Sequence, residues 1–335
     1  MEKVIKKWSS PGFLNGHWDE LADSYFQKRE FLELLHKYNP CAQRYYELYC
    51  DGTLVAGTIV YTLKIDLFTF SRIPSPFKVQ VIGLPVSVAS PPIIGVPEEF
   101  GYLLSEILKI EKGVILGINF KEDYLQDSVL NLRTLPTILL ELPGNNMAAY
   151  ENALRHCYRR RLRLIREKFS GVTSVTSGCS EFSEEHYSLY LQIMKKTTTK
   201  LEILNRDVFR NLPSNFRITT YYSDQVMLAW YVVCQDNDTL FFFFGGMNYE
   251  LRDRFQSYNN NLLGIIEDAF GSQSRIIDFG QTAEIAKTRF GGVLSERRMF
   301  FYHRNRIIFG LLKLSRKLIE YSRVSENPRV FRSVN

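Results

Sequence analysis

The sequence predicts an α+β (mixed α/β) protein of two domains, each with a central, mostly antiparallel mixed sheet flanked by helices. Three observations predict this class. The chain has 335 residues, 45% hydrophobic and 23% charged, and this length suits two domains of about 150 residues. Segments with helical period alternate with strand-like segments. The same order of elements (helix, antiparallel strands, loop, helix, strand) occurs twice.

The first half begins with a predicted helix over 17–38, where apolar residues recur at helical spacing. Two strand-like runs, 45–50 and 54–63, flank Asp51-Gly52, which is a strong signal for a two-residue hairpin. The remaining elements of this half are a strand at 77–84, a Pro/Gly-rich loop at 85–97, a helix at 98–110, and strands at 113–119 and 135–142.

The second half repeats this order. It begins with a helix at 183–196 and a short helix that Asn205 caps. The elements that follow are strands at 216–222, 226–234 and 239–247, a polar loop at 248–258, a helix at 259–270, a strand at 274–279, a helix at 282–290 and a strand at 297–303.

Between the halves, 147–169 predicts one long helix with an apolar face and an adjacent stripe of arginines. A last amphipathic helix is predicted over 305–323. The expected organisation is an N-terminal domain at 1–146, a connecting basic helix at 147–170, a C-terminal domain at 171–304, and a C-terminal helix and tail at 305–335.

The net charge of +6 is concentrated in two segments. Residues 151–170 carry seven Lys/Arg against two Glu, and residues 304–335 carry eight against two acids, which leaves −5 for the rest. Such segments favour an anionic partner: CoA, tRNA, lipid phosphate or a membrane surface. The alternative is that both are solvated helix faces. No exposed aromatics interleave with the arginines, so a DNA-binding role is not expected.

The N-terminus has no apolar signal region, and no apolar run approaches the length needed to span a bilayer. Five scattered cysteines without C-x-x-C spacing predict reduced thiols in a cytoplasmic protein. The five histidines show no metal-ligand spacing, so no metal is expected. The last helix is expected to dock on the protein body, with peripheral contact at the inner membrane face as the alternative.

Residues 276–292 read IIDFGQTAEIAKTRFGG, a predicted strand that runs through Asp-Phe-Gly-Gln-Thr into a helix with a lysine. This segment resembles the late strand–helix segment of GNAT acyltransferase domains. It is most similar to tandem GNAT proteins of the FemAB-like acyltransferase and Fem peptidoglycan-bridge aminoacyltransferase group, whose second domain carries a similar D-F-G-x-T-x(4)-K-x-R-x-G run. The order of elements extends the resemblance over most of the chain, whereas its motifs are confined to about 239–300. It implies two tandem GNAT-like domains and an acyl or aminoacyl transferase acting on an amine.

The resemblance places the donor in a notch between two splayed parallel strands. The [Arg/Gln]-x-x-Gly-x-[Gly/Ala] loop of acetyl-CoA users is absent, since 248–258 contains no glycine. Arg252 and Arg254 are candidates for phosphate contacts instead. Gly245 and Gly246 mark either close approach by the donor or a bulge. The donor stays open between acyl-CoA, acyl-carrier protein and aminoacyl-tRNA, and the acceptor is an amine-bearing small molecule or envelope precursor.

Direct attack by the acceptor amine needs no protein nucleophile, and no Ser-His-Asp or Cys-His signature is present. Asp278, at the end of a predicted strand, is a candidate to take a proton or hold the acceptor ammonium, the alternative being a cap for the next helix together with Thr282. Lys287 is a candidate to bind phosphate or stabilise negative charge, the alternative being a surface lysine. Tyr258 is a candidate acid or hydrogen-bond donor, the alternative being a packed tyrosine.

Four residues are candidates for substrate binding. Trp230 and Tyr231 point to opposite faces of a strand, so at most one lines the notch. Lys196 lies in a Lys/Thr-rich run that resembles an acceptor-side loop or is simply a basic helix end. Gln281 lies within the Asp-Phe-Gly-Gln-Thr run.

The first half is expected to lack a donor site, because Glu98 and Glu99 occupy the first turn of its later helix, where they repel phosphate. We interpret it as a degenerate or acceptor-binding copy. No residue of the second half is indispensable to a known chemistry. A non-catalytic double-GNAT module that binds an envelope precursor or partner protein is therefore the alternative function.

Overall fold

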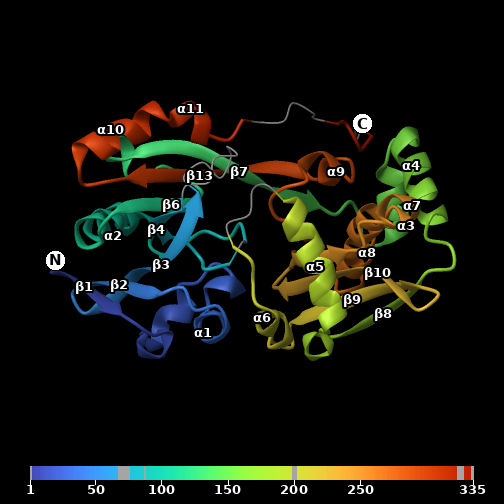
Figure 1. The fold of residues 1–335 in the computed structure, drawn as a ribbon, viewed down its shortest axis with the longest axis horizontal. Helices are drawn as coiled ribbons and strands as arrows, with labels where there is room; N and C mark the ends of the chain where they lie inside the picture. Colours follow the sequence, from blue (N-terminus) through green and yellow to red (C-terminus); the bar gives the residue numbers. More distant parts are fainter. Residues whose placement is uncertain (1, 67–75, 87, 198–201, 323–327, 333–335) are drawn as a thin grey trace. The chain divides into compact units, whose positions relative to one another are not determined.

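The structure, a computed structural model of the chain, describes residues 2–66, 76–86, 88–197, 202–322 and 328–332. The chain divides into two compact units, each built from discontinuous segments. Unit 1 comprises 1–135, 198–208 and 296–322, and unit 2 comprises 136–197, 209–295 and 323–335. Two long strands, β7 (Leu130–Glu141) and β13 (Val293–Tyr302), have residues in both units. Figure 1 shows the elements in sequence colours.

Unit 1 is built on a mixed sheet. Its other strands are β1 (Lys3–Trp8), β2 (Arg44–Cys50), β3 (Thr53–Asp66), β4 (Pro76–Ile82), β5 (Ile93–Gly95) and β6 (Val114–Phe120). The order is β1-β2-β3-β4-β6-β13, followed by the start of β7, and β5 pairs with β3. Strands β1 to β4 are antiparallel, and Cys50 pairs with Thr53 across the predicted Asp51-Gly52 hairpin, which is confirmed. Strands β4 and β6 are parallel.

Helices cover both faces of this sheet. They are α1 (Arg29–Tyr38), α2 (Pro97–Ile110), α10 (Arg306–Leu314) and α11 (Arg316–Ile319), while α6 (Arg206–Arg210) begins in unit 1 and ends in unit 2. Leu103 and Leu104 of α2 pack with Val60, whereas Leu312 of α10 packs with Tyr61. Because consecutive residues of a strand point to opposite faces, α2 and the α10–α11 pair lie on opposite sides of the sheet.

The predicted helix over 17–38 is wrong in its first half. Two short 3-10 helices, η2 (Gly16–Glu20) and η3 (Tyr25–Gln27), precede α1, and η1 (Pro11–Phe13) and η4 (Gln126–Ser128) occur elsewhere in the unit. The Asp19 carboxylate accepts a hydrogen bond from the Arg29 backbone N–H at 2.7 Å, and the Trp18 indole N–H donates to the Gln27 carbonyl at 2.9 Å. These bonds favour a compact turn over one continuous helix.

Unit 2 has a second mixed sheet. Its strands besides β7 are β8 (Thr173–Gly178), β9 (Phe216–Ser223), β10 (Val226–Asp236), β11 (Thr239–Met247) and β12 (Ile276–Asp278). The order is β7-β12-β11-β10-β9-β8, in which β11 and β12 are parallel and the other neighbours are antiparallel. Each unit thus places one parallel strand pair, joined through a helix, within a mostly antiparallel sheet.

The helices of unit 2 are α3 (Met147–Ala153), α4 (His156–Glu167), η5 (Cys179–Glu181), α5 (Glu184–Lys196), α7 (Arg252–Phe255), α8 (Ser257–Gly271) and α9 (Glu284–Thr288). The Trp230 indole N–H donates to the His186 carbonyl of α5 at 2.9 Å, and the Tyr231 hydroxyl donates to Asp268 of α8 at 2.9 Å. These adjacent residues of β10 point to opposite faces, so α5 and α8 cover opposite sides of the sheet (Figure 1).

The single helix predicted over 147–169 is wrong. Leu154 and Arg155 are extended and separate α3 from α4. The C-terminal segment explains the break, because Leu154 bridges to Phe331 and the Arg155 N–H donates to the Val330 carbonyl at 2.9 Å. Local periodicity could not reveal a partner so distant in sequence. The last predicted helix, 305–323, is likewise divided at Ser315.

Candidate functional site

The two parallel strands of unit 2 separate after a short pairing. Strand β12 pairs with β11 only from Thr239/Ile276 to Phe241/Asp278, although β11 continues to Met247. Beyond Asp278 the chain stays beside β7: the Phe279 N–H donates to the Ile138 carbonyl at 2.9 Å, and the Ile138 N–H donates to the Gly280 carbonyl at 3.3 Å. We call the end of this pairing the divergence point.

Asp278 lies at the divergence point and is 9% exposed. One carboxylate oxygen accepts hydrogen bonds from the Thr137 hydroxyl at 2.5 Å and from the Gly280 N–H at 2.8 Å. The expected alternative, that Asp278 and Thr282 cap the next helix, is wrong, because α9 begins after Ala283 and has no side-chain cap. Asp278 instead holds the turn that leaves β12.

That turn has an unusual backbone. Gly280, Thr282 and Ala283 have φ of +68°, +65° and +50°. Glycine adopts this region without a steric penalty, whereas a β-branched threonine there is strained. Strain of this kind persists only where surrounding contacts fix it, and it concentrates at functional sites.

Lys287 provides those contacts from α9. It is only 2% exposed, and its Nζ donates to the carbonyls of Gln281 at 2.6 Å and Gly280 at 3.2 Å. The alternative of a surface lysine is wrong. Burial lowers the pKa of the Lys287 amine from 10.5 to about 7, although the carboxylates of Asp278 and Glu284 act to raise it. Both the ammonium and the neutral amine are therefore populated near neutral pH.

Phe242 and Glu284 complete the surroundings of this amine. The Phe242 ring centroid lies 5.9 Å from Lys287 Nζ, within reach of a cation–π contact. Glu284 is 8% exposed on the first turn of α9. Asp278 and Lys287 both bind Gly280, through its N–H and its carbonyl respectively, so the two predicted residues meet at one turn.

Tyr258 does not join this hydrogen-bonded group. It lies on the first turn of α8 and packs against the apolar core of unit 2. Burial raises the pKa of its phenol. Within the described part of the chain its hydroxyl forms no hydrogen bond. Its predicted role in proton transfer stays a prediction.

The two arginines proposed for phosphate contacts lie on the short helix α7, which precedes α8. Arg252 forms an ion pair with Asp253 at 3.0 Å and stacks on the Tyr249 ring, 5.0 Å from its centroid. Arg254 is exposed and lies over the Phe255 ring. Arg252 already has a carboxylate partner, so an anionic ligand would have to compete for it.

The glycines and aromatics of β10 and β11 have a packing explanation. Trp230 is fully buried, and a Cβ placed on Gly246 would lie 2.1 Å from its indole nitrogen. Gly246 thus leaves room for the indole ring, and Gly245 sits beside it opposite Tyr231 in the ladder. Tyr231 is 1% exposed and is bonded to Asp268. Substrate contact by either aromatic would require this core to open.

The other two candidates for substrate binding lie in different surroundings. Lys196 is exposed at the last residue of α5. Gln281 is half-buried in the turn and accepts the Lys287 hydrogen bond through its backbone carbonyl. Of the predicted residues, the turn therefore brings together Asp278, Gln281 and Lys287.

Sequence reasoning missed Thr137, Phe242 and Glu284. Thr137 is 141 residues from its partner Asp278, and no motif marks it. Phe242 belongs to a run of four phenylalanines that predicts a buried strand rather than a site. Glu284 precedes Lys287 by three residues, a helical spacing that would have indicated proximity.

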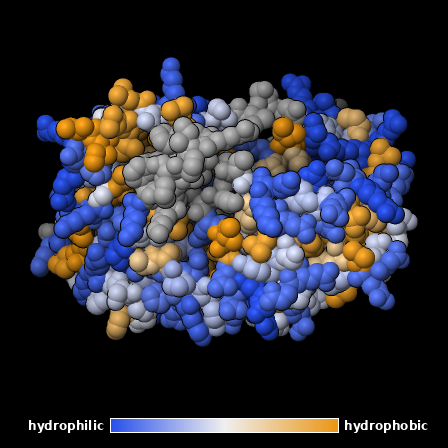
Figure 2. All heavy atoms as spheres, viewed as in Figure 1, coloured by the Kyte–Doolittle hydropathy of each residue, from blue (hydrophilic) through white to orange (hydrophobic). Residues whose placement is uncertain are grey.

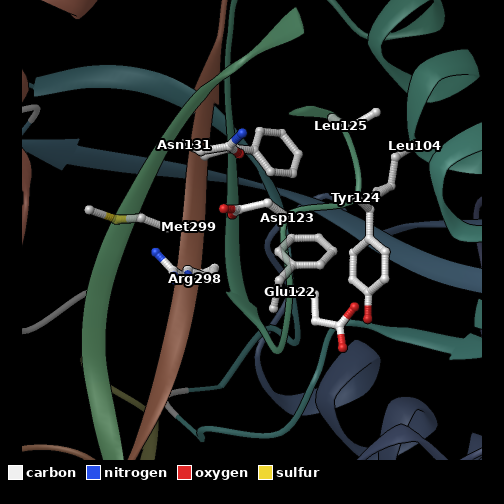
Figure 3. A pocket seen from close by; sticks show the side chains of 10 residues that line it. Leu104, Glu122, Asp123, Tyr124, Leu125, Asn131, Arg298 and Met299 are labelled. Atoms are coloured by element: carbon white, nitrogen blue, oxygen red, sulfur yellow. The ribbon is translucent and has the colours of Figure 1, made fainter. Parts of the chain in front are cut away.

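Unit 1 carries a separate shallow surface depression (Figure 3). It is lined by aromatic and aliphatic side chains with two adjacent carboxylates, Glu122 and Asp123, and with Arg298. Near the start of α2, Glu99 is paired with Lys3 at 2.5 Å. Carboxylates at both places do not favour phosphate binding in unit 1.

No three His, Cys, Asp or Glu side chains gather in a metal-binding cluster among the described residues. In the same part of the chain, no helix has the length and apolar character needed to cross a bilayer.

No protein-family model matches this chain, and no curated protein matches it. Solved structures do match its fold. FemX superposes with a TM-score of 0.57 at 14% identity, covering 93% of this chain and all of FemX. L-PGS from Bacillus licheniformis gives 0.52 at 12% identity, covering 85% of this chain and 94% of that one. A conserved protein of unknown function from Bacteroides thetaiotaomicron VPI-5482 gives 0.54 at 9% identity, covering 89% and 99%.

At these identities the matches establish the fold. They confirm the predicted class, a mixed α/β protein whose fold matches that of FemX.

Proposed function

We propose that this chain is an acyl or aminoacyl transferase that moves an acyl group from an activated donor to an amine by direct attack. The observation that carries the proposal is a buried lysine at the point where two parallel strands diverge. There Asp278 accepts a hydrogen bond from the Gly280 N–H, and Lys287 donates one to the Gly280 carbonyl. The FemX-like fold and the resemblance of 276–292 to Fem aminoacyltransferases support the same reaction class.

The reaction forms a C–N bond and breaks the bond between the acyl carbon and the donor's sulfur or oxygen. The attacking amine must lose a proton, the carbonyl oxygen becomes negative in the tetrahedral intermediate, and the leaving group takes up a proton. Asp278 suits the first need, because its carboxylate can hold the acceptor ammonium or accept its proton.

Lys287 suits the later needs. Two of its N–H groups are directed to the carbonyls of Gly280 and Gln281. As an ammonium it has one further N–H for the developing oxyanion or the leaving group, and as a neutral amine it has a lone pair to accept a proton. A pKa of about 7 allows both states near neutral pH.

A binding experiment with each class of donor identifies the one that the protein uses. Purified protein is heated with acetyl-CoA, a long-chain acyl-CoA, acyl-carrier protein or charged tRNA. A donor present at 100 times its dissociation constant stabilises the folded state by roughly 2.7 kcal/mol. We expect one class to raise the melting temperature. If none of the donors raises the melting temperature, the result contradicts the transferase proposal and favours the alternative, a non-catalytic binding module.

Lys287→Met separates catalysis from binding. The assay uses the donor that stabilises the protein and measures the rate at which free CoA, acyl-carrier protein or tRNA is released after an amine is added. We expect this rate to fall at least 100-fold in Lys287→Met, while the donor-induced rise in melting temperature persists. Lys112→Met, at an exposed lysine that follows α2, is the matched control and is expected to behave as wild type. Equal rates in all three proteins would remove Lys287 from the chemistry.

Arg252→Ala/Arg254→Ala tests the predicted phosphate contacts in the same experiment. A donor-induced shift that disappears in this variant supports them. An unchanged shift assigns donor binding to other residues.

A further inference from the structure

The C-terminal helices of unit 1 are apolar on two sides. Their inward side buries Leu312 and Ile319 against the sheet, and Phe309 packs on the same cluster. Their outward side also carries large aliphatic residues, and they are strongly exposed: Ile307 75%, Leu311 59%, Leu314 83% and Leu318 59%. A helix that only covers a core would have polar residues there.

The exposed aliphatic residues form one stripe. Positions 307, 311, 314 and 318 are separated by four, three and four residues, so they lie on one side across α10 and α11. Figure 2 shows the resulting apolar surface over α10, at the upper left of the view. Single exposed aliphatic residues are ordinary, but a continuous stripe marks an interaction surface.

A cationic stripe runs beside the apolar one. Arg306, Lys313 and Lys317 each directly precede a member of the apolar stripe, so they repeat at the same helical spacing along one flank. All three are exposed. Arg306 and Lys317 form no ion pair within the described residues, and Lys313 lies over the Phe309 ring.

The charge balance of this surface is positive. Arg316 is paired with Glu320 at 3.3 Å, and Glu320 is the one acidic residue between 304 and 322. A second protein surface of ordinary composition would match the apolar stripe alone. An anionic lipid surface matches both stripes at once, because acyl chains receive the aliphatic side chains while headgroup phosphates neutralise the cations.

We propose that the α10–α11 face docks unit 1 on an anionic lipid bilayer. The aliphatic stripe enters the boundary between headgroups and acyl chains, and Arg306, Lys313 and Lys317 contact the phosphates. The helices lie in the plane of the membrane and do not cross it. This inference does not depend on the transferase activity proposed above.

The test is sedimentation of the full-length protein with vesicles of phosphatidylglycerol and phosphatidylcholine, compared with phosphatidylcholine alone. We expect binding to the anionic vesicles that weakens as salt is added. Leu311→Glu/Leu314→Glu is expected to lower the partition coefficient at least tenfold. Lys313→Gln/Lys317→Gln is expected to lower it about fivefold for each cation removed.

Val175→Glu, at an exposed aliphatic residue of β8, is the matched control and should bind as wild type. Circular dichroism and melting temperature show whether each variant is folded. Equal affinity of wild type and Leu311→Glu/Leu314→Glu for anionic vesicles, or no binding to either vesicle, overturns the proposal. So does a dimer in analytical ultracentrifugation that the double glutamate variant abolishes, because the face would then join two copies of this chain.

Discussion

Lys287 makes the stability of the folded protein depend on pH in a direction that can be calculated. Burial lowers the pKa of its amine to about 7, whereas an unfolded chain has the ordinary value of 10.5. Between these values the unfolded chain binds more protons than the folded one, so raising the pH favours folding. Below pH 7 both states are protonated, and the full cost of the buried charge is present. Above pH 10.5 neither state is protonated, and that cost has vanished.

The magnitude follows from linkage. The difference between the two pKa values corresponds to about 5 kcal/mol in total. Between pH 7 and 9, the free energy of unfolding is expected to rise by about 2 kcal/mol through this residue. Lys287→Met removes the titration. It also leaves the carbonyls of Gly280 and Gln281 without their donor, which lowers stability by an amount that does not change with pH.

Urea denaturation of wild type and Lys287→Met, followed by tryptophan fluorescence from pH 6 to 9.5, measures this difference. Relative to Lys287→Met, we expect wild type to gain about 2 kcal/mol of stability between pH 7 and 9, with Lys112→Met parallel to wild type. If wild type and Lys287→Met are parallel across the whole range, the Lys287 amine is not desolvated and its assigned role in proton transfer fails.

Three further predictions concern buried residues, each of which packs within one of the two units. Gly246→Ala places a methyl group against the Trp230 indole and should lower the free energy of unfolding by roughly 1–3 kcal/mol. Burial lowers the pKa of His186 to about 4, so stability should fall by about 1.5 kcal/mol from pH 6.5 to 5, and His186→Gln should flatten that fall. Glu111→Gln weakens a buried pair with Arg44, 2.8 Å apart, and should cost roughly 2–3 kcal/mol at pH 7.

Urea denaturation tests all three. For His186, an equal fall in stability from pH 6.5 to 5 in wild type and His186→Gln would contradict the prediction. Gly271→Ala, where an added methyl meets open space, is the control for Gly246→Ala, and equal stability of the two variants would contradict the packing argument. The pKa of Glu111 is lowered because hydrogen bonds from Arg44 and Tyr46 outweigh its desolvation. The deficit of Glu111→Gln should therefore shrink as the pH falls below about 4, and a constant deficit would contradict it.

Sequence periodicity identified most strands and helices because the local pattern and the final packing agree. The hairpin at Asp51-Gly52 and the helix near 259–270 are examples. It failed where a distant segment decides the local structure. Leu154 and Arg155 fit a helical pattern, but their backbone bonds to Phe331 and the neighbouring residue break the helix.

The candidate site shows the same limit. Asp278 and Lys287 were predicted because the motif that contains them is local in sequence. That Lys287 is buried could not be read from its neighbours, because its burial depends on Phe242 and on the turn at Gly280. Thr137 binds Asp278 from a strand 141 residues away, and only the paired sheet brings them together.

The most direct measurement of the central claim is amide hydrogen exchange in the presence of each donor class. A donor that binds where β11 and β12 diverge should slow exchange in residues 242–247 and 278–292 and leave the distant strands of unit 2 unchanged. Protection confined to unit 1, or no protection at the divergence point with any acyl-CoA, acyl-carrier protein or charged tRNA, would contradict a donor site built around Asp278 and Lys287.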